Sequence, residues 1–561
     1  MNKKPIVYQL IPRLFTNYNE HCVPNGTLKQ NESGKLKSIN KATLNSIARM
    51  GFSHVWLTGV IEHSHCSDYT VYGIPRDNPH VIKGLAGSPY AISDYYDIDP
   101  DLAVDPAKRM EEFEDTVKRI HEAGLKVIID FVPNHVARQY RSDARPADAP
   151  ADFGADDYTT MFFAPTNNFY YIPGHEFAPT VDMGSGSDAY HEFPAKASGN
   201  DCFTASPGQY DWYDTVKLNY GIDPANGWRH FNPIPSTWTK MLNILMYWTS
   251  KGVDGFRCDM VHMVPLEFWQ WAIRQVKEAY PGIIFIAEIY DVNLYRPFIE
   301  IGGFDYLYDK VGMYDTLREI VTAGRPASDI TRAWQRIDGH QQNMLYFLEN
   351  HDEQRFASTQ FAGDPFKAFA PMAVSALMGP GAVMVYAGQE LGEPAAEAEG
   401  YSGLDGRTTI FDYWSIGTIR RWLNGGRPSK TNLTDAEIKL REGYSRLLNV
   451  AATEDAINEG QFFDVMYVNP ASERFDPNRH YAFLRRKGNE IILVVANFGD
   501  TEANVAVNIP AHAFDYLRMI HGEKEAKELL TGAMLKVTVE PDRPFTTKVP
   551  AHGAAVWKWT D

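Results

Sequence analysis

Four short apolar runs in this chain each lead into an acidic residue. The acids are Asp130, Asp259, Glu288 and Asp352, and the residues before each one are typical of a buried strand. A parallel strand buried on both faces has little reason to end in a carboxylate unless that end lines a site. Because the carboxyl ends of neighbouring parallel strands meet at one edge of a sheet, we expect these acids to converge on one pocket.

Strand-like runs alternate with amphipathic helices over much of the chain. In one such unit, Asp105-Pro106 suits a helix start, Gly124 suits a helix end, and the next strand stops at Asp130. About eight such units predict an α/β fold in the form of a (β/α)8 TIM barrel. The expected strands lie at residues 6–11, 54–60, 127–130, 252–259, 283–288, 304–308, 344–348 and 382–386.

Two segments break this rhythm. Residues 137–235 are rich in Gly, Pro, Asn, Asp and Tyr and lack a helical period, which predicts an inserted subdomain after strand 3. Residues 454–561 contain strand-like runs separated by turns, which predicts a C-terminal antiparallel β-sandwich. The barrel is then expected to comprise residues 1–136 and 236–453.

Charge and cysteine content narrow the partners of the protein. A net charge of -17 argues against nucleic acid or an anionic membrane surface. The four cysteines show no metal-ligand spacing, so we expect reduced thiols. No apolar run is long enough to span a bilayer, and the first strand-like run is interrupted by polar residues, unlike a signal peptide. These features favour a cytoplasmic protein.

Four motifs in order carry a family resemblance. Asp130-Phe-Val-Pro-Asn-His135, Gly255-Phe-Arg-Cys-Asp259, the strand end at Glu288 and Asn350-His-Asp352 resemble the signatures of the α-amylase family, glycoside hydrolase family 13. The resemblance covers nearly the whole chain. It implies the same barrel, an insertion after strand 3 and a C-terminal sandwich.

The resemblance also implies roles for the acids. Asp259 would be the nucleophile, Glu288 the general acid/base, and Asp352 the acid that grips sugar hydroxyls and stabilises the transition state. Arg257, two residues before Asp259 and on the same strand face, would keep that carboxylate ionised. Asp130 would support the site. Further substrate contacts are implied for Tyr90, by stacking, and for His135 and His351, by hydrogen bonding.

Two positions bear on recognition and metal binding. His262-Met263 stands where the family often has Lys-His, so His262 is expected to contact the sugar on the leaving-group side. Asn134 keeps the position of a familiar calcium ligand, although an Asn that forms a turn is the alternative. A structural calcium ion is thus implied but its ligands are not, because acids of the insertion such as Asp201 align with no ligand position. No organic cofactor is implied.

The chemistry implied is that of a retaining enzyme, in which one carboxylate attacks an acetal and another donates a proton. The main prediction is a hydrolase of α-1,4-linked glucans or maltooligosaccharides. The alternative is a transglycosidase or isomerase of the same family, similar to a trehalose synthase or a glucanotransferase. Non-enzymatic members of the family lack the acids and carry a membrane helix, which this sequence does not match. The oligomeric state stays open.

Overall fold

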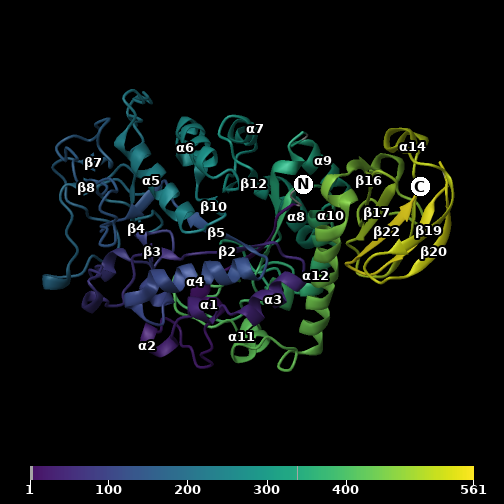
Figure 1. Ribbon diagram of the computed structural model, residues 1–561, viewed down its shortest axis with the longest axis horizontal. Helices are drawn as coiled ribbons and strands as arrows, with labels where there is room; N and C mark the ends of the chain where they lie inside the picture. Colours follow the sequence, from purple (N-terminus) through teal and green to yellow (C-terminus); the bar gives the residue numbers. More distant parts are fainter. Residues whose placement is uncertain (1–3, 338, 542) are drawn as a thin grey trace.

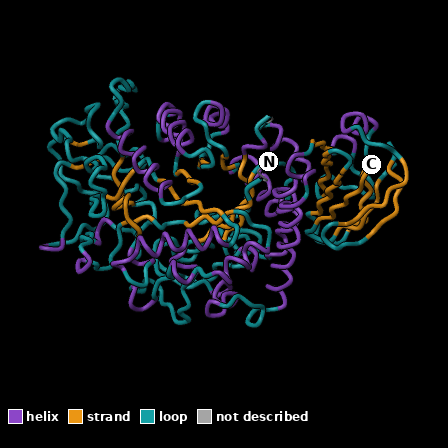
Figure 2. The backbone as a smooth tube through the Cα atoms, viewed as in Figure 1, coloured by secondary structure: helices purple, strands orange, loops and turns teal. Residues whose placement is uncertain are grey.

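Eight parallel strands form a closed barrel, as the sequence predicts. The computed structural model describes residues 4–337, 339–541 and 543–561. The strands close in the order β1-β14-β13-β12-β11-β10-β5-β2, and Figure 2 shows them in the middle of the larger part of the molecule. Their bounds are β1 Ile6–Leu10, β2 His54–Leu57, β5 Lys126–Phe131, β10 Gly255–Cys258, β11 Ile284–Ala287, β12 Tyr306–Tyr308, β13 Met344–Tyr346 and β14 Ala382–Tyr386.

Helices surround this barrel, and their ends follow local chemistry. Before helix α4 (Arg109–Glu122), the Asp105 carboxylate accepts a hydrogen bond from the Ala107 N–H at 3.1 Å and Pro106 begins the first turn. Gly124 follows the helix with φ +77°, a conformation that suits glycine. The other principal helices are α3 Lys41–Arg49, α5 Ser236–Ser250, α6 Leu266–Ala279, α7 Val292–Glu300, α8 Asp315–Ala323, α9 Ile330–Gln335, α10 Phe369–Leu377 and α12 Asp435–Thr453.

The connection from β2 to α4 contains a hairpin that the sequence analysis did not predict. The expected strand at 54–60 ends at Leu57, and Gly59 turns the chain with φ +72°. β3 (Ile61–His63) then pairs antiparallel with β4 (Ile92–Ile98). The long loop inside this hairpin forms part of the rim above the barrel.

The segment after β5 is mostly loops. β6 (His135–Ala137) pairs antiparallel with β9 (Thr215–Lys217), so the start of this insertion lies beside a strand in its last third. A second pair, β7 (Tyr171–Ile172) and β8 (Ala195–Lys196), lies at the far left of Figure 1. A small apolar core joins the insertion to the loop between β3 and β4. It is formed by Phe177, Tyr190, Ala195, Ala205 and Tyr213 of the insertion and by Val81 of that loop.

Antiparallel sheets form the C-terminal part, as predicted. A six-stranded sheet has the order β15-β16-β17-β22-β19-β20, and β18 pairs with β21. The Phe545 ring on β21 stacks on Trp559 of β22 with centroids 5.9 Å apart, which joins the two sheets. The bounds are β15 Gln461–Asp464, β16 His480–Lys487, β17 Glu490–Asn497, β18 Ala503–Val507, β19 Gly522–Glu528, β20 Met534–Val539, β21 Phe545–Val549 and β22 Ala554–Thr560.

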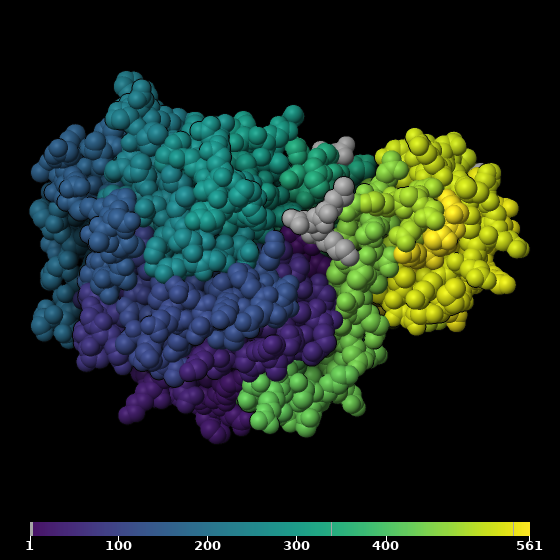
Figure 3. Space-filling model, viewed as in Figure 1, coloured from purple at the N-terminus to yellow at the C-terminus, as the bar shows by residue number. Residues whose placement is uncertain are grey.

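The C-terminal sheets sit at one end of the long axis, beside α12 (Figures 1 and 3). Helix α10 packs against β17 and β22. In the part of the chain that the structure describes, no helix is both long and apolar enough to cross a membrane.

A buried arginine connects the two parts. Arg485 on β16 is only 2% exposed, and its guanidinium donates to the carbonyl oxygens of Met378 (3.0 Å), Ala456 (3.1 Å), Ile457 (3.0 Å) and Gly460 (2.6 Å). Burial lowers the pKa of Arg485 to about 10. The charge is therefore stabilised by backbone dipoles rather than by a carboxylate.

We expect Arg485→Met to destabilise the protein because it leaves several buried carbonyl oxygens without a donor. The free energy of unfolding should fall by roughly 2–4 kcal/mol, measured by chemical denaturation. Arg543→Met is the control, since that side chain is 58% exposed. Equal and small losses in both variants would show that the Arg485 contacts do not hold the junction.

Candidate active site

One buried guanidinium lies between two of the predicted catalytic acids. Arg257 is fully buried on β10, and its Nη1 donates to Asp259 Oδ1 at 2.8 Å. Its Nη2 lies 2.9 Å from Glu288 Oε2. The two carboxyl groups are therefore close enough for a single side chain to contact both.

Strand register explains why Asp259 and Glu288 lie close together. Arg257 and Asp259 are two residues apart and so point to the same side of the chain. Cys258 pairs with Ala287 on β11, which places Asp259 and Glu288 level with each other just past the strand ends. The sequence motifs thus become neighbours because the strands are parallel and adjacent.

Asp352 lies on the outer side of the same cluster. Its Oδ2 is 3.0 Å from His351 Nε2 and 3.9 Å from Arg257 Nη2, and its side chain is 38% exposed. Burial opposes ionisation, but His351 and Arg257 outweigh it and lower the pKa of Asp352 to about 2. This acid is the one most open to a ligand.

Asp130 lies beneath the other acids, as its implied supporting role requires. It accepts hydrogen bonds from Trp56 Nε1 at 3.0 Å, from the Gly59 N–H at 3.3 Å and from the Tyr90 hydroxyl at 3.2 Å. Its Oδ1 is also 3.7 Å from Arg257 Nη1. Asp130 therefore ties the rim loop that carries Tyr90 to the barrel floor.

Tyr90 and His351 form a stacked pair. Their ring centroids are 5.4 Å apart, and the Tyr90 hydroxyl lies 2.5 Å from His351 Nε2. Gln9 Nε2 lies 2.6 Å from Nδ1 on the other side of the imidazole. Both ring nitrogens of His351 are thus held in place. His351 contacts Asp352 and Tyr90, which line the pocket, but does not line the pocket itself.

The Asp259 carboxyl group is shifted toward its protonated form. Burial, and then the neighbouring Glu288, raise the pKa of Asp259 well above its usual range, while Arg257 acts in the opposite direction. Asp259 must therefore lose its proton before it can attack an acetal carbon. One attacking carboxylate and one proton donor is the state that acetal cleavage requires.

A pocket of about 380 Å³ opens above these acids. Of the predicted site residues, Tyr90, His135, Asp259, Glu288 and Asp352 line it. Arg257 and His351 lie buried beneath it. His262 lies outside this lining, exposed on the short helix Val261–Met263. The pocket is completed by Lys83, Ser88, Trp212, Asp214, Thr215, Met260, Tyr290, Ile410 and Phe411.

Several of these residues were missed from sequence. The Tyr290 hydroxyl donates to Glu288 Oε1 at 2.5 Å, and the Met260 N–H donates to Glu288 Oε2 at 2.9 Å. Met260 adopts the left-handed conformation with φ 43°, a strained backbone that aims its N–H at the acid. Tyr290 follows Glu288 by two residues, a spacing that could have identified it. Trp212, whose ring meets His135 at 5.1 Å, gave no such signal.

A protein cation lies beside the implied calcium ligand. Asn134 Oδ1 accepts a hydrogen bond from the Lys217 ammonium, which also lies 2.6 Å from Asp201 Oδ1. A calcium ion bound to the same oxygen atoms would have to displace this ammonium. The residues around Asn134 therefore do not fit a bound calcium ion.

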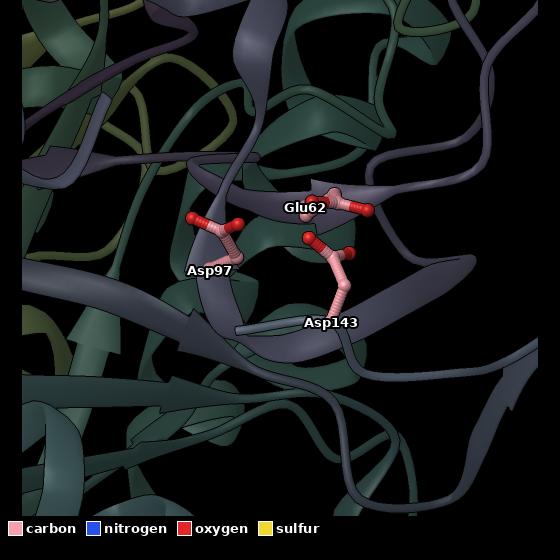
Figure 4. A group of neighbouring side chains, drawn as sticks. All are labelled: Glu62, Asp97 and Asp143. Carbon is pink, nitrogen blue, oxygen red and sulfur yellow. The ribbon is translucent and has the colours of Figure 1, made fainter. Parts of the chain in front are cut away.

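A group of three carboxylates lies elsewhere, between the β3–β4 hairpin and the start of the insertion. Oxygen atoms of Glu62, Asp97 and Asp143 lie within 4.8 Å of one another (Figure 4). Arg109 Nε donates to Asp97 Oδ2 at 2.8 Å, so the group already has a positive partner. Burial and neighbouring acids raise the pKa of Glu62 well above its usual range. A protonated Glu62 accounts for the group without a metal.

Comparison with known proteins agrees with this geometry. The alpha amylase catalytic domain model matches residues 9–409, and the alpha amylase C-terminal all-beta domain model matches residues 474–560. The structure resembles the maltogenic alpha-amylase AmyB from Thermotoga neapolitana, with a TM-score of 0.62, 20% identity and 99% of each chain covered. At this identity the likeness shows the fold.

Two curated relatives each match a part of the chain. Alpha-amylase MalA of Haloarcula japonica is 25% identical over 355 residues, 62% of this chain and 40% of that protein. An alpha-1,4-glucan:maltose-1-phosphate maltosyltransferase of Burkholderia pseudomallei is 27% identical over 249 residues, 38% of this chain and 20% of that protein. The chain thus spans less than half the length of these two relatives. With the catalytic-domain match covering most of its residues, the chain belongs to the α-amylase family.

Proposed function

We propose that this protein is a retaining α-glucoside hydrolase that acts on α-1,4-linked glucans or maltooligosaccharides. The observation that carries the proposal is the single buried guanidinium of Arg257, which contacts both Asp259 and Glu288 under a pocket edged by Asp352. Three carboxyl groups gathered in this way suit an acetal substrate, whose transition state is positively charged.

In the proposed reaction, Asp259 attacks the anomeric carbon while Glu288 protonates the departing oxygen. Water then attacks the anomeric carbon, the bond to Asp259 breaks to release its carboxylate, and Glu288 takes the proton from that water. Asp352 stabilises the positive charge on the sugar ring. An inverting enzyme needs its two carboxyl groups far enough apart to hold a water molecule between them. Contact of both groups with one guanidinium favours the retaining course.

The pocket supports a short substrate or a chain end. Its volume of about 380 Å³ is near the lower end of the range of about 300–1,000 Å³ seen for ligand sites. Trp212 and Phe411 provide apolar ring faces in its lining, as sugar-binding sites use. The reaction needs only side chains and water, so no organic cofactor forms part of the proposal.

The second candidate is a transglycosidase or isomerase of the same family. It shares the glycosyl-enzyme, and only the acceptor differs. Met260 and Tyr290 line the pocket beside Glu288, where an acceptor sugar would find apolar surface. The maltosyltransferase among the relatives agrees with this alternative.

A cytoplasmic location is also proposed. All four cysteines are free and none forms a disulfide, which suits a reducing compartment.

A time course of products on maltose, maltoheptaose, pullulan and soluble starch tests the proposal. Hydrolysis predicts glucose and short oligosaccharides, with the newly formed reducing end appearing first as the α-anomer by NMR. Trehalose or lengthened oligosaccharides would favour the transferase alternative. Initial release of the β-anomer would contradict double displacement.

Asp259→Asn, which removes the nucleophile at nearly constant volume, should lower kcat by roughly 10⁴-fold or more.

Glu288→Gln should impair natural glucans more than a substrate with a phenolate leaving group. A sugar alkoxide must be protonated as it departs, whereas a phenolate leaves without help. The measurement is the rate of glycosyl-enzyme formation with each substrate. Asp259→Asn is the control, because it should abolish this step for both. Equal damage by Glu288→Gln to both substrates would rule out its role as the acid.

The acidic limb of the pH profile should come from Asp259 and not from Asp352. Asp259 must be ionised to attack, so activity rises as the pH passes its raised pKa. Asp352, with a pKa of about 2, is already ionised there. We therefore expect the weak residual activity of Asp352→Asn to keep an acidic limb in kcat/KM. Disappearance of that limb in this variant would assign it to Asp352 instead.

A further inference from the structure

Lys217 is a buried cation at the joint between the insertion and the barrel. It is the last residue of β9 and is 6% exposed. Its ammonium donates to Asn134 Oδ1, to Asp201 Oδ1 at 2.6 Å and to the Met263 carbonyl oxygen at 3.2 Å. These three acceptors come from the chain after β5, from the insertion and from the chain after Asp259.

The surroundings of the ammonium are oriented for it. Asn134 Nδ2 donates to the Gly199 carbonyl oxygen at 2.8 Å, which turns Oδ1 toward Lys217. Asp201 is held at φ 61°, a left-handed conformation that a non-glycine residue adopts at a cost. Three acceptors match the three N–H donors of an ammonium. They are too few for calcium, which takes six to eight oxygen ligands.

The same group reaches the pocket through one more residue. Asn134 Nδ2 lies 3.1 Å from Nδ1 of His135, which lines the pocket, and His135 is paired with Lys217 in the β6–β9 register. Met263 ends the short helix that begins two residues after Asp259. Lys217 therefore fixes one pocket wall and the segment that leaves the nucleophile.

We propose that Lys217 is a built-in structural cation that replaces a divalent metal between the insertion and the barrel and positions His135 in the pocket. Its ammonium supplies the positive charge around which Asn134, Asp201 and Met263 are arranged, and this charge is part of the polypeptide itself. The joint is then independent of calcium. The inference rests on the proposed function only where activity is measured.

Removal of the side chain tests this directly. Lys217→Ala leaves the three oxygen atoms without their cation, and water molecules that enter the vacated space can supply the further oxygen ligands that calcium needs. We expect a lower melting temperature than wild type, and recovery of roughly 2–4 °C in millimolar calcium. Isothermal titration calorimetry should find one more calcium ion per molecule than in wild type. The melting temperature of the wild type should stay nearly constant when either EDTA or calcium is added.

Lys240→Ala is the matched control. Lys240 is also a buried lysine, and its ammonium contacts Asn168 Oδ1 and the Asp152 carbonyl oxygen, both at 2.8 Å. It should lose stability without gaining a calcium ion. Any calcium bound by Glu62, Asp97 and Asp143 would be common to all three proteins and cancels in the comparison.

Lys217→Met fills the space without a charge. It should be destabilised, should bind no additional calcium, and should show a kcat/KM about tenfold lower or worse, because His135 loses its support. Calcium should raise kcat/KM of Lys217→Ala and leave that of Lys217→Met unchanged.

Three results would overturn the inference. The first is a Lys217→Ala protein that binds no more calcium than wild type and Lys240→Ala. The second is a Lys217→Ala protein that fails to fold even when calcium is present. If the defect is severe, the inference requires that calcium restores folding. The third is a wild-type protein that EDTA destabilises more than it destabilises the Lys217 variants. Melting and calorimetry give these answers whether or not the protein hydrolyses glucans.

Discussion

The rest of the site depends on the electrostatic interaction between the Arg257 guanidinium and the carboxyl groups around it. A guanidinium fully removed from water is costly unless anionic partners surround it. Here Asp130, Asp259, Glu288 and Asp352 all lie within 4 Å of it. The shared cation in turn offsets the repulsion among the acids. Asp130 belongs to β5, and Asp259, Glu288 and Asp352 follow β10, β11 and β13, so the site is complete only when these strands lie side by side in the barrel.

Much of the fold and the centre of the site could be predicted from sequence. Strand position, parallel order and the identity of each strand-end residue together locate Asp259, Glu288 and Asp352 at one edge of the barrel, and the structure places them there. These features are local: an apolar run, its last residue and the next helix. The C-terminal sheets could likewise be predicted from short apolar runs between turns.

The pocket walls could not be predicted in this way. Gly59 ends β2 early and starts a hairpin, but a single glycine inside an apolar run does not reveal that outcome. Trp212 and Lys217 reach the site from the insertion, whose loops have no period from which to place them. His262 is expected to contact the sugar on the leaving-group side, and the structure places it exposed on the short helix after Asp259, outside the pocket lining. Contacts between segments far apart in sequence decided each case.

The antiparallel pairing of β6 with β9 has an evolutionary consequence. It brings the start of the insertion beside residues 215–217, which enclose most of the insertion between them. Length changes or wholesale exchange of the residues between these strands would leave the path of the barrel backbone unaltered. Related genes could therefore recombine at this point and acquire a different outer wall, while the residues at the base of the segment, His135 and Lys217, stay with the acids they serve. New substrate preferences could then arise by replacing one contiguous stretch of coding sequence.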